Sequence, residues 1–191
     1  MSYDLRAFAP SPGEDPLQTA HSIFEREEEI PSPASRNPEA EAKKKALTEA
    51  LTRHNPQLSP FQLQYEDIAK LQQITIEEAK AQYRYIELNG PEDGNGIQIT
   101  LHDTEASITV PYWHERPQAD VVFQEIWGYL RILQESGGYC IYDPQLERIL
   151  DLNNDFEDVV RCYTAITGNL HRSCATEPPS PDTKKPWWKF W

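Results

Sequence analysis

Residues 83–113 read YRYIELNGPEDGNGIQITLHDTEASITVPYW, and this stretch decides the fold. It holds three runs rich in β-branched and aromatic residues, separated by the turn-rich PEDGNG and by Asp103-Thr104-Glu105. Such runs joined by turn residues predict an antiparallel meander. In the middle run, apolar residues at odd positions alternate with polar residues at even positions up to His102. We therefore expect one covered and one wet sheet face.

The chain after the meander predicts a helix, two strands and a second helix. An apolar stripe at helical spacing predicts a helix over 117–135, ended by Gly137 and Gly138. The runs GYCIYD and RILDL predict two strands, after which Asn153 or Asn154 is predicted to cap a final helix. The order βββαββα is typical of an α+β fold, in which a largely antiparallel sheet carries helices on one face.

The N-terminal part predicts a short strand followed by helices. The apolar residues Tyr3, Leu5 and Ala7 alternate with the charged residues Asp4 and Arg6, and this period of two predicts a strand. Pro16 and Pro38 suit the first positions of two helices, and an N-terminal helical extension of the core is therefore expected. Helices are predicted over 15–29, 37–54, 64–71 and 76–82. The chain is predicted to form a single domain over 1–174, with the N-terminal strand and helices in 1–60 and the core in 83–172. Residues 175–191 are predicted to form a flexible aromatic tail.

Charge and composition favour some functional classes over others. The formal net charge is −13, and residues 61–120 hold eleven acidic against four basic side chains. The negative electrostatic field of these charges disfavours nucleic acid and anionic lipid as partners and favours a cationic protein. The chain lacks a signal peptide pattern at its start and any apolar run of membrane-spanning length, so a cytoplasmic location is expected. The cysteines Cys140, Cys162 and Cys174 show no CxxC spacing, so neither a disulfide framework nor a zinc knuckle is predicted.

Residues with the chemistry for catalysis or metal binding occur without the spacing that these functions need. His102 and His114 are predicted to lie near each other on the wet side of the sheet, but no HxH or HExxH pattern fixes them. Cys140 falls inside a strand as a packed thiol, and DLNNDFED at 151–158 resembles a calcium loop without its central glycine. We therefore predict no catalytic residues, no metal and no cofactor.

The segment KKPWWKFW at 184–191 combines four aromatic residues with three lysines. It favours an interfacial anchor, a stacking strip, self-packing against the domain, or disorder, and the sequence leaves these alternatives open. Exposed aromatic clusters are typical of interaction sites, so the tail is a second candidate contact.

Several segments together resemble a group of uncharacterised bacterial proteins. They are the MSYDL opening, the YRYIEL and ITVPYW strands, the GYCIYDPQ turn and the WWKFW ending, so the likeness covers both ends and residues 83–145. Some members of that group resemble immunity proteins, the cytoplasmic antidotes of secreted antibacterial toxins. The resemblance implies a non-catalytic inhibitor that binds a basic toxin domain directly.

The predicted function is therefore protein–protein interaction, with a basic toxin domain as the expected partner and no nucleic acid or membrane. The alternatives are an adaptor that self-associates through its aromatic tail, and an enzyme of unrecognised type. The residues predicted to contact the partner lie on the wet sheet face and its loops: His102, Asp103, Glu105, Tyr112, Trp113, His114, Tyr142 and Asp143.

Overall fold

The computed structural model describes residues 1–25, 37–91 and 93–175. The last part of the predicted helix over 15–29 and almost all of the predicted aromatic tail, from residue 176 onward, lie outside the described residues. Seven strands form one antiparallel sheet, in the order β2-β3-β4-β5-β1-β6-β7. The strands are β1 (Ser2–Phe8), β2 (Ser59–Pro60), β3 (Ile86–Asn89), β4 (Gln98–Leu101), β5 (Glu105–Pro111), β6 (Cys140–Asp143) and β7 (Arg148–Ile149).

The meander predicted from residues 83–113 is confirmed as β3, β4 and β5. Leu88 lies opposite Ile99, which in turn lies opposite Ile108, so one face of the three strands is apolar. Ile99 and Ile108 are buried, whereas Gln98 and Thr100 on either side of Ile99 are half-buried. The alternation in the sequence therefore predicts correctly which side chains enter the core.

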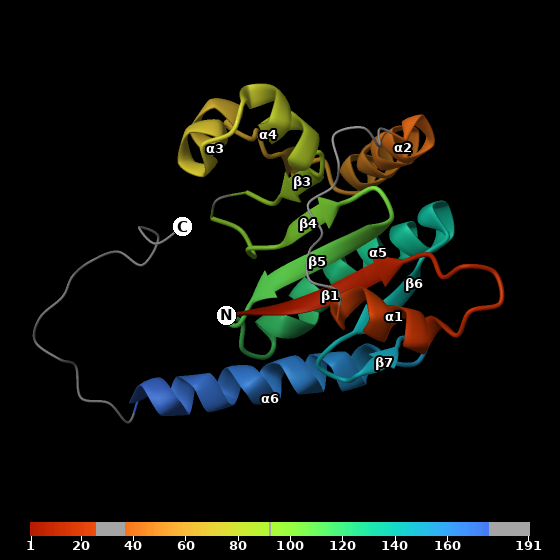
Figure 1. Ribbon diagram of the computed structural model, residues 1–191. Helices are drawn as coiled ribbons and strands as arrows, with labels where there is room; N and C mark the ends of the chain where they lie inside the picture. Colours follow the sequence, from red (N-terminus) through yellow and green to blue (C-terminus); the bar gives the residue numbers. More distant parts are fainter. Residues whose placement is uncertain (26–36, 92, 176–191) are drawn as a thin grey trace, which may run out of the picture.

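The N-terminal strand occupies the centre of the sheet. β1 pairs with β5 along its whole length and with β6 over Arg6–Phe8 (Figure 1). Tyr3, Leu5 and Ala7 are all buried and belong to the main core. The core thus extends beyond residues 83–172, because its middle strand comes from the N-terminus.

Helices cover the sheet mainly on the face that carries Tyr3 and Ile99. The helix Gln118–Gly137 packs on that face, where Phe123 contacts Tyr3, and its buried side chains include Phe123, Tyr129 and Leu130. The helices are α1 (Pro16–Glu25), α2 (Pro38–His54), α3 (Tyr65–Gln72), α4 (Ile76–Gln82), α5 (Gln118–Gly137) and α6 (Phe156–Ala175). The α+β prediction is confirmed.

Local capping explains where the helices begin and end. The Asn37 side chain accepts a hydrogen bond from the Glu39 amide at the start of α2, as the sequence predicts. Thr75 and Glu78 form a capping box at the start of α4. Gly138 ends α5 with a φ of +66°, a backbone conformation that glycine adopts without steric cost.

The other face of the sheet is polar in the middle and apolar at one end. Phe8 and Tyr142 point to this face and pack with Ala20 of α1, forming a small second core. Figure 1 shows α1 and α5 on opposite sides of β1. The helix α1 turns Ala20 and Ile23 toward the sheet, whereas its Leu17 is exposed.

Two further details differ from the sequence predictions. β2 was not predicted, because two residues that include Pro60 give no strand signal; Pro60 is tolerated there since β2 is an edge strand. The predicted cap at Asn153 or Asn154 is wrong. α6 begins at Phe156, and Asp151 instead accepts hydrogen bonds from the Asn153 amide and the Asn154 side chain in the preceding turn.

Candidate binding surface

The eight residues predicted to contact a partner do not form one surface. His102, Asp103 and Glu105 lie at the turn between β4 and β5, where the His102 amide donates to the Glu105 carbonyl. His114 follows the opposite end of β5. The six peptide units of β5 at ~3.3 Å each separate the two histidines by about 20 Å. The prediction that the two imidazoles are neighbours is therefore wrong, because they flank opposite ends of one strand.

Three of the eight residues are interior. Asp143 is 0% exposed, Tyr142 is 4% exposed and His114 is 8% exposed. A partner has no access to these side chains in this structure, so the expectation that they lie on the wet surface is wrong. Tyr142 sits under α1, and β6 turns Asp143 into the main core beside Tyr3.

Trp113 is the most accessible of the eight, with 51% of its surface exposed. Its ring lies against the backbone of Gly96, where an added Cβ would come within 2.6 Å of Trp113 Cζ2. Its indole nitrogen lies 2.8 Å from Nε2 of His114. The indole is thus held in a defined position although half of it faces outward.

His114 Nε2 lies between a hydrogen-bond donor and a hydrogen-bond acceptor. The indole N–H of Trp113 donates to it when that nitrogen carries no proton. The carbonyl oxygen of Asn95, 2.7 Å away, accepts from it when the nitrogen is protonated. The tautomer of His114 therefore decides whether Nε2 accepts from Trp113 or donates to Asn95.

Glu125 fixes the loop that carries Asn95 and Gly96. Its Oε2 atom accepts a hydrogen bond of 2.6 Å from the Asn95 side chain. Its Oε1 atom accepts from the side chains of Asn55 and Tyr129. These hydrogen bonds connect the end of α2, the middle of α5 and Asn95, so the backbone beside Trp113 is anchored to the core.

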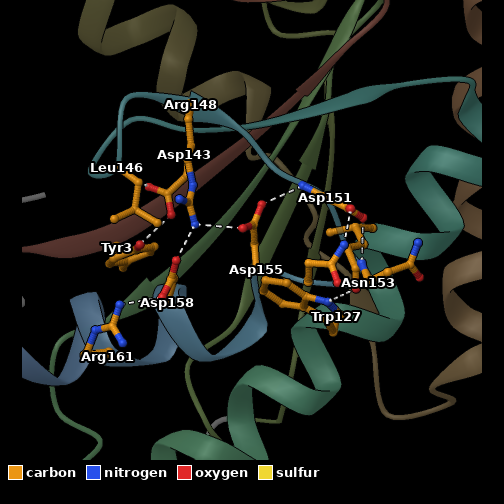
Figure 2. A network of polar contacts seen from close by, with 12 residues as sticks. Tyr3, Trp127, Asp143, Leu146, Arg148, Asp151, Asn153, Asp155, Asp158 and Arg161 are labelled. Carbon is orange, nitrogen blue, oxygen red and sulfur yellow. Dashed lines mark hydrogen bonds and ion pairs between the residues drawn. The ribbon is translucent and has the colours of Figure 1, made fainter.

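A second cluster surrounds the buried Asp143, as Figure 2 shows. The Tyr3 hydroxyl donates to Asp143 Oδ2 over 2.5 Å, and the amides of Gln145 and Leu146 donate to Oδ1. Burial raises the pKa of Asp143, while these hydrogen bonds and Arg148 act in the opposite direction. Each oxygen of this carboxylate has a donor, as a buried acid requires.

Arg148 connects the Asp143 cluster to the start of α6. Its Nη2 atom lies 2.8 Å from Asp155 and 2.9 Å from Asp158, and Asp158 also binds Arg161 (Figure 2). The bond with Arg148 holds the pKa of Asp158 below its usual range. These acids are therefore engaged in ion pairs at a helix start rather than grouped around an open centre.

The third cluster lies at the β4–β5 turn, where Asp103 faces two cations. Asp103 Oδ1 is 2.6 Å from Lys44 Nζ, and Oδ2 is 3.4 Å from Arg84. Lys44 also binds Glu41 and the carbonyl of Arg84, and only 2% of its side chain is exposed. Asp103, predicted as a partner contact, thus serves to neutralise a buried lysine. His102 is half-buried and packs its ring on Tyr85.

The remaining two predicted residues are half-buried. Tyr112 stacks on Tyr163 and meets the edge of Tyr3, and burial raises the pKa of Tyr112 to about 12. Glu105 begins β5 opposite Phe8. Tyr112 and Asp143 thus meet around Tyr3, an association that sequence spacing does not show.

The cysteines and the acidic groups give no reactive arrangement in the part of the chain that the structure describes. Burial raises the pKa of the Cys140 and Cys162 thiols, which disfavours the thiolate that a nucleophile needs. No group of three or more His, Cys, Asp or Glu residues in this part is placed to hold a metal ion.

No protein family model, curated protein or solved structure matches the chain. None of the described helices has the length and apolar character to cross a membrane.

Sequence reasoning missed residues that matter to these clusters. Lys44 was not singled out, although it continues the stripe of Leu47 and Leu51 at helical spacing, which marks it as an inward-facing lysine. Asn95 and Glu125 gave no signal, because their contact joins a loop to a helix 30 residues away.

Proposed function

We propose that this protein is a non-catalytic cytoplasmic binding protein that neutralises a basic antibacterial toxin domain by direct contact, as immunity proteins do. The observation that carries the proposal is the position of Trp113. A tryptophan that is half exposed yet held against Gly96 and His114 loses little conformational freedom when a partner covers it. Tryptophan is enriched among the residues that dominate binding energy at interfaces.

The charges around Trp113 favour a cationic partner. We call Asp93, Trp113, Glu115, Asp120 and Glu157 the Trp113 surface. Asp93 is three residues before Gly96, which lies against the Trp113 ring, and Glu115 is two residues after Trp113. Asp120 and Glu157 share Arg116 as their ion-pair partner, three residues after Trp113. Within it Arg116 is already bound to Asp120 and Glu157, at 3.6 and 3.4 Å. The local excess of carboxylates agrees with the net charge of −13 and supports fast association with a basic domain.

The decisive experiment is co-purification of the native chain with its partner from its own cell, followed by a binding assay with two variants. We expect Trp113→Ala to weaken the complex by about 2 kcal/mol or more, as hot-spot truncations do. Phe61→Ala is the matched control, because Phe61 is 52% exposed and directly follows β2, the edge strand of the sheet. Equal loss of affinity in both variants, or none in Trp113→Ala, would refute the assignment of the binding surface.

Charge reversal tests the electrostatic part of the proposal. Asp93→Lys combined with Glu115→Lys should slow association with the basic partner and reduce its salt dependence. Glu66→Lys combined with Glu77→Lys changes the net charge equally on α3 and α4, away from Trp113. Stopped-flow association at low salt distinguishes the pairs. Rates that remain unchanged in the first pair contradict steering by the Trp113 surface.

A further inference from the structure

A pocket of about 430 Å³ opens on the part of the molecule formed by α2, α3 and α4. Its lining residues are Glu41 of α2, Tyr65 of α3, Lys80 of α4 and Arg84, which precedes β3. Figure 1 shows α3 and α4 beside β3, at the opposite end of the sheet from α6. We call this the Arg84 pocket. It shares no residue with the Trp113 surface.

The pocket holds more positive than negative charge in a strongly acidic chain. Lys44, Lys80 and Arg84 are the cations in or directly behind it, and Glu41 and Asp103 are the carboxylates. Lys44 binds both carboxylates, at 2.9 and 2.6 Å. Three cations thus share two carboxylates, which leaves an excess of one positive charge at the pocket.

Arg84 is the cation that lacks full compensation. Its side chain is 11% exposed, and its only ion pair in the described residues is the 3.4 Å contact of Nη2 with Asp103. Its Nη1 atom is buried and has no hydrogen-bond partner in that part of the chain. A buried guanidinium donor without an acceptor is costly, so an anionic oxygen supplied from outside would stabilise this arrangement.

The other walls suit such a group. Lys80 is exposed at the pocket mouth and makes no ion pair with any residue that the structure describes. Lys44 donates to the Arg84 carbonyl over 2.8 Å, and the Tyr65 hydroxyl donates to the Tyr83 carbonyl, so the backbone around Arg84 is fixed from two helices. A planar guanidinium in a fixed segment matches the paired oxygens of a carboxylate or phosphate.

We propose that the Arg84 pocket binds the carboxylate or phosphate group of a small molecule, with Arg84 and Lys80 as the hydrogen-bond donors. The volume lies in the range of small-molecule sites, about 300–1,000 Å³. This ligand is distinct from the protein partner proposed above, and the inference does not depend on that partner.

Amide NMR of the full chain tests the proposal with inorganic phosphate and with succinate, each at constant ionic strength. We expect saturable shifts of the amides around Lys80 and Arg84 with at least one anion. Arg84→Gln should weaken that binding about tenfold or more, the usual effect of losing a charge-assisted hydrogen bond. Response to phosphate alone assigns a phosphorylated ligand, and response to succinate alone assigns a carboxylate.

Two further variants keep the test decisive. Lys80→Gln changes an exposed side chain on α4, so it reports on binding even where Arg84→Gln loses its fold. Lys70→Gln removes the same charge from an exposed position on α3 that does not line the pocket. The proposal is overturned if neither anion gives saturable shifts, or if Lys70→Gln weakens binding as much as Lys80→Gln does.

Discussion

Replacing Tyr3 by phenylalanine tests the buried hydrogen bond at the centre of the sheet. The Tyr3 hydroxyl is the only donor to Asp143 Oδ2 among the described residues, and both side chains are 0% exposed. Phenylalanine keeps the ring contacts with Phe123 and Tyr163 but leaves this oxygen without a donor. Since hydrogen bonds to charged groups contribute about 1.5–3 kcal/mol, we expect the free energy of unfolding to fall by about 2–3 kcal/mol.

Urea unfolding followed by circular dichroism measures this loss, and thermal unfolding should show a Tm lower by roughly 5–10 °C for a chain of this size. Tyr85→Phe is the matched control. Tyr85 is a half-buried tyrosine whose hydroxyl makes no hydrogen bond in the described residues, so its removal should change stability by less than about 0.5 kcal/mol. A Tyr3→Phe variant as stable as Tyr85→Phe would refute the reasoning.

The pH dependence of stability provides an independent measure of the same site. Burial raises the pKa of Asp143 above the ~3.9 of an unfolded aspartate. Between that value and the higher native pKa, the native protein holds a proton that the unfolded chain has lost, so stability falls as pH rises. Asp143→Asn cannot titrate. The stability of the native chain relative to Asp143→Asn should therefore decline from about pH 4 upward and then level off. A constant or rising difference in urea unfolding would show that Asp143 does not titrate as described.

The remaining predictions concern three positions and use the same unfolding measurement. Lys44→Met should lower stability by about 2 kcal/mol, less than the ~3–5 kcal/mol of a fully buried pair, because the Asp103 side chain is 29% exposed and keeps Arg84. Gly138→Ala should lower stability by about 1–2 kcal/mol, because alanine is strained at a φ of +66°. Asn37→Ala removes the cap of α2 and should lower stability by about 1 kcal/mol. An unchanged unfolding midpoint in any of these variants contradicts the role given to that residue.

The fold could be predicted from the sequence wherever local signals agree with tertiary packing. The alternation of residues 96–103 identifies β4 and its buried face, because the strand is covered on one side only. The Asn37-Pro38 pair fixes the start of α2, since both residues act within one helical turn. What could not be predicted is long-range placement. The alternation of β1 indicates a strand but not its position between β5 and β6.

The candidate surface was predicted less well, because burial in a sheet depends on neighbours that sequence spacing does not show. Trp113 is exposed as expected, but His114 beside it is buried, with its backbone amide donating to the Tyr163 hydroxyl and its ring lying against the Asn95 carbonyl. An aspartate next to a turn, such as Asp143, is usually exposed. Asp143 is nevertheless buried, because Tyr3, 140 positions away in the sequence, supplies a hydrogen-bond donor. Polar residues whose partners are remote are the ones that sequence reasoning places wrongly.

β1 joins two parts of the sheet that the chain builds separately. β2 to β5 come from residues 59–111, and β6 and β7 come from residues 140–149. Without β1, the long edge of β5 and the edge of β6 would both be open to unwanted pairing. β1 therefore completes the sheet through pairings of high sequence separation, and such pairings slow folding. The Tyr3–Asp143 hydrogen bond lies on this junction, so it couples the docking of the N-terminus to the burial of the most enclosed acid in the described chain.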